Sequence, residues 1–349
     1  MLGSARAWRP TSALLAVSLA TTAGMPSAQV SSPPSKATLV MLTVIVSRDG
    51  RPVSDLTAAE VEVLDNGVAQ TIEAFGHVDT VTGDSPEPPG DFVLVLDDFG
   101  TLPAGTSGAV SVGLALLNAL GPPDRLSVVN TGPFALIQQL STVRATSRAT
   151  IRRFLGQRHS SSSRSEACRR SVVSLGVIED ALKVMAQQPS TRRAMLVVSD
   201  SQRVYWGEAR GQKCSQARKV FDRVVAASSI ANVAIYGVDP GTQHAPDLRG
   251  AGITHTPAVG AVTKVRRPSE TPSGSLVVLA RTTGGTVTSA AEGATDGAHQ
   301  FVGDTRQYYR VVYRQPEVPR GSRNQFRKVE VRVLRPDVAV RTRELYVPD

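Results

Sequence analysis

The stretch at residues 92–101 reads FVLVLDDFGT, and its first five residues decide the fold. Phe92–Leu96 is an unbroken apolar run that stops at Asp97. Similar short runs return at Leu126–Val129, Met195–Val198 and Val233–Val238. A strand that is buried on both faces has this pattern, so the four runs predict neighbouring strands of a parallel sheet covered by helices.

Helical periods lie between these runs. The clearest is a stripe of residues that would share one face of a helix, at spacings of three, one, three, one and three: Ala217, Val220, Phe221, Val224, Val225 and Ser228. Weaker stripes cover 110–117 and 172–185. Strands that alternate with helices predict βαβ units, and hence an α/β fold with a doubly wound, mostly parallel sheet.

Both ends of the chain are β-rich. Lys36–Ser47 is rich in Thr, Leu and Val, and an Asn66-Gly67 pair between apolar runs predicts a hairpin. Three further strands are expected at Tyr308–Arg314, Phe326–Arg335 and Val338–Val347. Because three strands alone make a marginal sheet, we expect the two ends to build one β-sandwich, with the α/β domain inserted between them.

The chain begins with a pattern typical of secretion. Arg6 and Arg9 precede the apolar stretch Ser12–Ala23, and small residues follow it, as in a secretory signal peptide. Cleavage is expected after Ala28, with Ala23 or Gly24 as alternatives. No apolar run approaches the roughly 20 residues that span a bilayer. The sequence therefore predicts an exported protein, periplasmic, outer-surface or secreted, with no transmembrane segment after signal removal.

These patterns divide the chain into six parts. They are a signal peptide (1–28), a spacer (29–35), the N-terminal strands of the sandwich (36–78), a Pro-rich linker (79–91), the α/β domain (92–304) and the basic C-terminal strands (305–349).

The positive charge is concentrated in the last part. The net charge of the chain is +9, and residues 305–349 hold eleven basic and five acidic residues, 11 − 5 = +6. Two interpretations stay open, a solvated strand face and a surface that meets an anionic envelope polymer. A nucleic-acid partner is not expected, because the chain is exported and has no zinc-finger, helix-turn-helix or RNA-recognition pattern.

The chain has two cysteines, Cys168 and Cys214. In an oxidising compartment they are a candidate disulfide, and two free thiols are the alternative.

The ordered segments resemble a known family. SRDGRPVSDLTAAEVEVLDNGVAQTIEAF, FVLVLDDFGT, LVVSD, VAIYGVDP, LARTTGG, RQYYRVVYR and FRKVEVRVLRPDVAVRTRELYVPD follow one another over about residues 38–348. This order resembles the secreted von Willebrand factor A (VWFA)-related proteins of the acidobacterial type. The resemblance implies a doubly wound A-type domain with β extensions at both ends. It implies no defined reaction.

The same resemblance implies a candidate metal site. A-type domains carry a metal-ion-dependent adhesion site with the pattern Asp-x-Ser-x-Ser, a Thr from a second loop and a later Asp. Laid on this chain, the oxygen-bearing positions are Asp97, Thr101 and Asp200, which suit Mg²⁺ or another divalent cation. Phe99 stands at the first Ser position and cannot ligate a metal, and the second loop offers only the hydroxyls of Ser160–Ser163 and Ser165.

We therefore hold two interpretations of these carboxylates. In the first, Asp97, Thr101 and Asp200 form a degenerate site that binds a cation weakly, with Asp98 as an extra carboxylate. In the second, which we favour, Asp97 and Asp200 cap backbone N–H groups at strand–helix turns. No cofactor is certain from the sequence.

The function prediction is a binding, adhesion or scaffold protein that acts through the loop-rich face of the VWFA-like domain. Asp98, Tyr205 and Trp206 are the candidate binding residues, because aromatic side chains dominate interface hot spots. The partner is expected to be another protein at the cell envelope. The alternative is a structural component of an envelope assembly that docks through the basic β-sandwich with Arg327, Arg332 and Arg341.

No enzyme is expected. The sequence has no Gly-x-Ser-x-Gly elbow and no phosphate loop after the first strand of the α/β domain, and its five histidines are scattered. No catalytic residue is therefore predicted.

Overall fold

The structure is a computed structural model that describes residues 38–81, 89–132, 138–158, 163–200, 214–241, 275–289, 293–317 and 325–348. The predicted signal peptide, the spacer and residues 82–88 of the predicted linker lie outside the described residues. The chain from Thr38 onward forms one compact unit.

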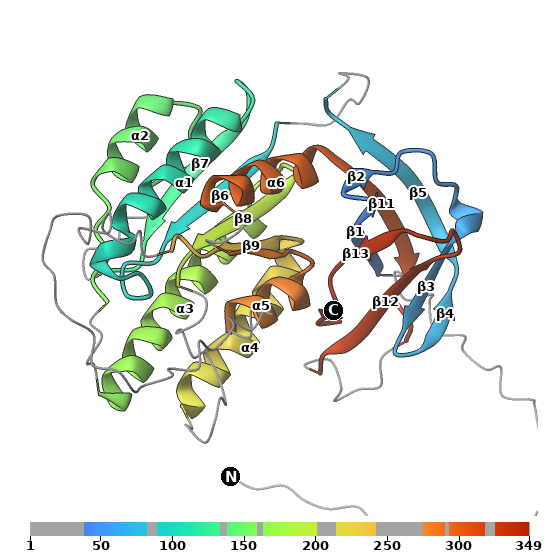
Figure 1. Cartoon of the computed structure of the whole chain (residues 1–349). Helices are drawn as coiled ribbons and strands as arrows, with labels where there is room; N and C mark the ends of the chain where they lie inside the picture. Colours follow the sequence, from blue (N-terminus) through green and yellow to red (C-terminus); the bar gives the residue numbers. More distant parts are fainter. Residues whose placement is uncertain are drawn as a thin grey trace, which may run out of the picture. The chain divides into compact units, whose positions relative to one another are not determined.

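A five-stranded parallel sheet occupies the middle of the chain (Figure 1). Its strands are β6 (Asp91–Leu96), β7 (Arg125–Asn130), β8 (Arg193–Val198), β9 (Ala234–Val238) and β10 (Val287–Thr288). The order is β10-β9-β8-β6-β7, and every neighbouring pair is parallel. The four strands predicted from apolar runs are confirmed. The α/β class with a parallel sheet is confirmed with them.

Helices cover both faces of this sheet (Figure 1). Alternate residues of its strands are buried in the two opposite layers. Phe92, Leu94 and Leu96 of β6 belong to one buried cluster, and Val93 and Val95 belong to the other. The first cluster includes residues of α1 (Thr106–Ala119), α2 (Arg144–Arg152) and α6 (Ala294–Arg306). The second includes residues of α3 (Arg164–Ala186), α4 (Ser215–Ala231) and α5 (Ser275–Thr283). Burial on both faces explains why the strands read as continuous apolar runs.

Helix α4 shows how the sequence pattern produces an element. Ala217, Val220, Phe221, Val224, Val225 and Ser228, the predicted stripe, are all buried. The helix ends at Asn232, which has a left-handed φ of 48°. Asn tolerates this conformation better than most residues, so the chain can turn directly into β9.

The β-rich ends of the chain form two antiparallel sheets. One has the order β13-β1-β11-β5 with β2 beside β1, and the other has the order β14-β12-β3-β4. Their strands are β1 (Leu39–Arg48), β2 (Arg51–Pro52), β3 (Val61–Asp65), β4 (Val68–Gln70), β5 (Ile72–Asp79), β11 (Gln307–Arg314), β12 (Arg327–Val333), β13 (Ala339–Arg341) and β14 (Leu345–Tyr346). The predicted hairpin joins β3 to β4, and Asn66 and Gly67 both have positive φ, 49° and 81°.

Both sheets contribute to a single buried cluster that contains Leu42, Val63, Val311 and Val329. Each sheet combines N-terminal with C-terminal strands, since β1 pairs with β11 and β3 pairs with β12. The prediction of one long strand at Val338–Val347 was wrong. This segment divides into two short strands in different sheets: β13 pairs with β1 over three residues, and β14 pairs with β12 over two.

Many arginines of the C-terminal segment have acidic partners inside the protein. Arg327 pairs with Asp65 at 2.7 Å, and Arg341 pairs with Asp304 at 2.5 Å. Further ion pairs of arginines in the described part of this segment are Arg314–Glu73, Arg332–Glu62, Arg332–Glu330, Arg335–Asp55 and Arg335–Glu60. Much of the charge that reads as a uniform basic segment in the sequence is therefore compensated in three dimensions.

Within the described part of the chain, no helix combines the length and the apolar character needed to cross a bilayer.

Candidate functional site

The candidate site lies at the carboxyl edge of the parallel sheet. Asp97 follows β6, Thr131 follows β7, and Ser199 and Asp200 follow β8. The carboxyl ends of parallel strands share one edge, and ligands of open α/β sheets bind there. The structure thus brings together side chains that are between 34 and 102 residues apart in the sequence.

The Asp97 carboxylate is buried and accepts three hydroxyl hydrogen bonds. Thr131 Oγ1 and Ser174 Oγ donate to Oδ1 at 2.7 and 2.8 Å, and Ser199 Oγ donates to Oδ2 at 2.7 Å. Asp97 is 1% exposed. A buried carboxylate needs such donors, because an unpaired charge in the interior is costly. The carboxylate therefore holds the ends of three strands and helix α3 together.

The Asp98 carboxylate also faces the end of β7. Its Oδ2 accepts hydrogen bonds from the backbone N–H groups of Thr131 and Gly132, at 3.0 and 3.1 Å. Its Oδ1 lies 3.4 Å from the Nε2 donor of Gln157. Burial raises the pKa of Asp98 above its usual value, and the neighbouring Asp97 acts in the same direction.

Arg158 brings a positive charge to this edge. Its Nη2 lies 2.7 Å from Asp200 Oδ2, and the two side chains are only 11% and 15% exposed. Backbone hydrogen bonds fix the segment that carries it, because Gln157 N donates to Asp98 O and Arg158 N donates to Thr101 O. The turn after β6 thereby positions the guanidinium beside Asp200.

Two further groups complete the edge. The hydroxyl of Thr101 is buried and has no hydrogen-bond partner within the described residues. The half-buried Phe99 ring carries the guanidinium of Arg170 at 5.6 Å from its centroid, a cation–π contact. Arg170 also donates to Glu166, one turn earlier on α3.

A disulfide joins two helices that begin at this edge. Cys168 lies in the second turn of α3, and Cys214 is the N-cap residue of α4. They form the predicted bridge, with their Cα atoms 5.7 Å apart. Cys168 therefore lies in the Ser/Arg-rich first part of α3, ahead of the apolar stripe at 172–185.

Asp97, Asp98, Thr101 and Asp200 all lie at this edge, where Thr101 N donates to Asp97 O and Asp200 N donates to Gly100 O. For Asp97 the contacts differ from the favoured capping interpretation, and the residues that follow Asp200 lie outside the described residues. The Asp97 side chain binds hydroxyls and Asp200 binds a guanidinium, while Asp98 is the carboxylate that accepts backbone N–H groups. Tyr205 and Trp206, the predicted aromatic anchors, lie outside the described residues, as do Ser160–Ser162.

Sequence reasoning missed Thr131, Ser174, Ser199 and Arg158. One signal could have found Thr131, because it is the first residue after its strand, as Asp97 is after β6. Ser199 directly precedes Asp200 and could have been found with it. Ser174 and Arg158 are placed by long-range packing and leave no local signal.

In the described ranges, no group of three or more His, Cys, Asp or Glu side chains is placed to hold a metal ion. Any cation at this edge would depend on hydroxyl oxygens in addition to carboxylates.

Comparison with known proteins gives fold-level likenesses only. No protein-family model matches the chain, and no curated protein matches it. An aerotolerance-related membrane protein from Bacteroides fragilis matches with 13% identity and a TM-score of 0.34, over 61% of this chain and 98% of that one. A von Willebrand factor type A protein from Catenulispora acidiphila matches with 10% identity and a TM-score of 0.34, over 90% and 76%.

The vWF domain of the type V pili tip protein Mfa5 from Porphyromonas gingivalis matches with 16% identity and a TM-score of 0.27. This match covers 33% of our chain and 39% of that structure, well under two thirds of its length. All three TM-scores are below 0.5, so the fold described here rests on the strand order and pairing of the chain itself.

Proposed function

We propose that this chain is an exported binding or scaffold protein, and that the carboxyl edge of its VWFA-like domain holds another protein at the cell envelope. One observation carries the proposal: four chain segments converge at this edge, and a disulfide joins the two helices beside them. The two antiparallel sheets, interpreted as a β-sandwich, support this domain.

The arrangement of Asp97 favours binding over catalysis. Both of its oxygens accept hydroxyl hydrogens, so neither is presented to a substrate as a base. The charge of Asp200 is matched by Arg158. We therefore include no reaction in the proposal.

Whether these residues fit a divalent cation can be judged from their contacts. The candidate ligand atoms are all oxygens, and the Thr101 hydroxyl, which has no hydrogen-bond partner among the described residues, favours a metal ion. Against this, Arg158 lies 2.7 Å from Asp200, so a cation beside Asp200 would meet a like charge. Phe99 occupies the position of the first Ser ligand. The residues as arranged do not fit Mg²⁺, and we propose a metal-free face in which Arg158 supplies the positive charge.

The metal-free face predicts a gain of metal sensitivity in Arg158→Ala. In the wild type, ~1 mM Mg²⁺ or Mn²⁺ should leave the melting temperature unchanged, because a ligand stabilises only a protein that binds it. In Arg158→Ala the Asp200 carboxylate loses its partner, and the same ions should raise the melting temperature by about 2–4 °C. Differential scanning fluorimetry with and without EDTA measures both.

Arg153→Ala is the matched control, since Arg153 is an exposed arginine at the end of α2. It should behave as the wild type does. A wild-type protein stabilised by Mg²⁺ would contradict the metal-free face, and an Arg158→Ala variant that stays insensitive would contradict the role of Arg158.

The proposed binding function predicts that capture of the partner depends on Phe99. Phe99 is half-buried at the edge, so Phe99→Ala removes contact area without emptying the core. Aromatic anchors dominate binding energy, and we expect cross-linked capture of the partner from the envelope fraction to fall at least about tenfold. The double variant Tyr205→Ala/Trp206→Ala tests the anchors predicted from the sequence.

Lys183→Ala, an exposed change in the last turn of α3, is the control and should capture normally. Normal capture by both Phe99→Ala and Tyr205→Ala/Trp206→Ala would refute binding through this edge. The alternative of docking through the basic strands is less favoured, because Arg327, Arg332 and Arg341 already have acidic partners within the chain.

A further inference from the structure

A small cavity lies at the opposite, amino edge of the parallel sheet. Its volume is about 30 Å³, and its lining includes the start of β8, the start of β9 and the C-terminal segment between β13 and β14. Three arginines line it: Arg192, Arg193 and Arg343.

Arg343 is buried and has only neutral acceptors. It is 7% exposed, and it donates to the carbonyl of Ser229 and to Asn232 Oδ1. Burial lowers the pKa of Arg343 to about 10, which still leaves it cationic at neutral pH. Within the described residues, no carboxylate forms an ion pair with it.

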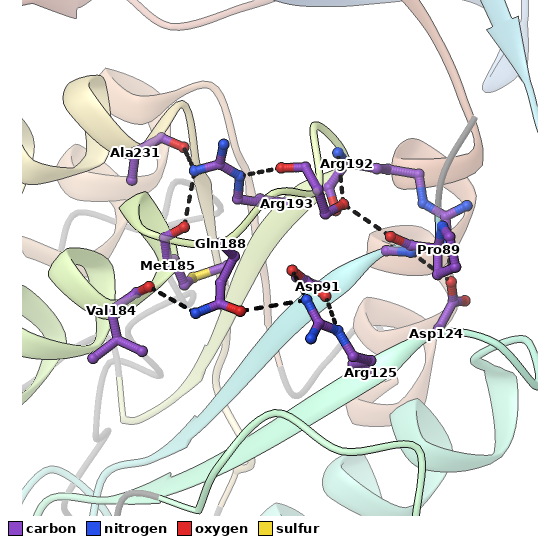
Figure 2. A network of polar contacts seen from close by, with 12 residues as sticks. Pro89, Asp91, Asp124, Arg125, Val184, Met185, Gln188, Arg192, Arg193 and Ala231 are labelled. Carbon is purple, nitrogen blue, oxygen red and sulfur yellow. Dashed lines mark hydrogen bonds and ion pairs between the residues drawn. The ribbon is translucent and has the colours of Figure 1, made fainter. Parts of the chain in front are cut away.

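Arg193 is half-buried, and its printed hydrogen bonds also go only to neutral acceptors. Figure 2 shows its guanidinium beside the carbonyls of Met185 and Ala231, to which Nη1 donates at 2.9 Å each. Its Nε donates to the carbonyl of Ser190. Burial lowers the pKa of Arg193, and the attraction of Asp91 opposes this shift only in part. Asp91 itself is held by Arg125 through two contacts of 2.6 Å.

Arg192 adds a donor that has no acceptor. Its Nη2 pairs with Asp124 (Figure 2). Its guanidinium lies over the Phe92 ring, 5.5 Å from the centroid. The side chain is only 8% exposed, and its Nε has no hydrogen-bond partner in the described part of the chain. Buried donors are almost always paired, so this atom indicates a missing acceptor.

The charges around the cavity therefore do not balance. Asp124 pairs with Arg192, and Asp304, the one acid in the lining, pairs with Arg341. Among the described residues, neither Arg193 nor Arg343 forms an ion pair with a carboxylate, and for the buried Arg343 a charge without a counter-charge is costly. A bound anion would remove this cost.

We propose that this cavity binds a small monovalent anion of halide size, with chloride as the ligand. A volume of about 30 Å³ exceeds the roughly 10–15 Å³ that one water requires, and it leaves no space for a nucleotide or sugar phosphate. The anion accepts from the guanidinium groups of the lining and compensates the half-buried Arg193 and the buried Arg343. Because Arg343 belongs to the C-terminal segment and Arg193 begins β8, the anion connects that segment to the parallel sheet.

The test compares thermal unfolding in sodium chloride and in sodium gluconate at equal ionic strength, since gluconate is too large to enter. Chloride should raise the melting temperature by about 2–4 °C in a saturable way. Arg343→Met should lose this increment, and Arg153→Met, an exposed control, should retain it. Equal melting temperatures in the two salts, or an unchanged increment in Arg343→Met, would overturn the proposal.

A second measurement covers the case in which Arg343→Met does not fold. Crystals of the wild-type protein soaked in bromide should give an anomalous peak within contact distance of the Arg193 and Arg343 guanidinium groups. Water density there without an anomalous peak would overturn the proposal as well.

Discussion

Replacing Asp65 by alanine is expected to lower the free energy of unfolding by about 3–5 kcal/mol, the usual cost of breaking a buried ion pair. Asp65 is fully buried at the end of β3. Its carboxylate accepts from the hydroxyls of Tyr313 and Tyr346, at 3.0 and 2.6 Å, and from Arg327 Nε at 2.7 Å. The substitution leaves all three donors unpaired in the interior, which explains the size of the effect.

Urea unfolding, followed by both circular dichroism and tryptophan fluorescence, measures this loss. Asp55→Ala is the matched control, because Asp55 is a highly exposed carboxylate that also pairs with an arginine, Arg335. It should leave the unfolding midpoint near that of the wild type, since exposed ion pairs contribute little. An Asp65→Ala midpoint equal to the Asp55→Ala midpoint would show that Asp65 does not hold the two sheets together.

Removing the disulfide is expected to have an effect of similar size. The bridge closes a loop with a sequence separation of 46, and the loss of chain entropy in the unfolded state predicts a stabilisation of roughly 4 kcal/mol. The double variant Cys168→Ser/Cys214→Ser should therefore unfold at a clearly lower urea concentration than the oxidised wild type.

Dithiothreitol provides the internal control for this prediction. It should shift the wild-type midpoint to that of the double variant, and it should leave the double variant unchanged. Identical wild-type midpoints with and without reductant would mean that the bridge does not form or does not stabilise the fold.

The main strands could be predicted from the sequence because a strand buried on both faces needs apolar residues at consecutive positions. Phe92–Leu96 shows this, since all five side chains are buried. Strand β10 was missed because two residues carry no period. Helix α2 was missed because only Ser147 and Ile151 of its nine residues are buried, which is too few for a stripe.

Residues of the candidate site could be predicted only where a polar side chain comes directly after a predicted strand. Asp97 and Asp200 stand immediately after or near strand ends, so the parallel sheet itself places them together. Arg158 comes from a segment without periodicity, and backbone hydrogen bonds to Asp98 and Thr101 position it. In the same way, the charge of the C-terminal segment could be counted from the sequence, whereas its acidic partners, such as Asp304 for Arg341, could not.

The pairing of the two chain ends has a consequence for biosynthesis. Leu56 N donates to the hydroxyl of Tyr309, 253 residues later, and β1 has β11 and β13 as its neighbours in the sheet. While a ribosome is still producing the middle of the chain, β1 and β3 therefore lack these C-terminal neighbours and expose apolar edges. Long-range pairing of this kind is slow and prone to aggregation. The N-terminal strands must accordingly be kept apart from other nascent chains until the last fifty residues have been made.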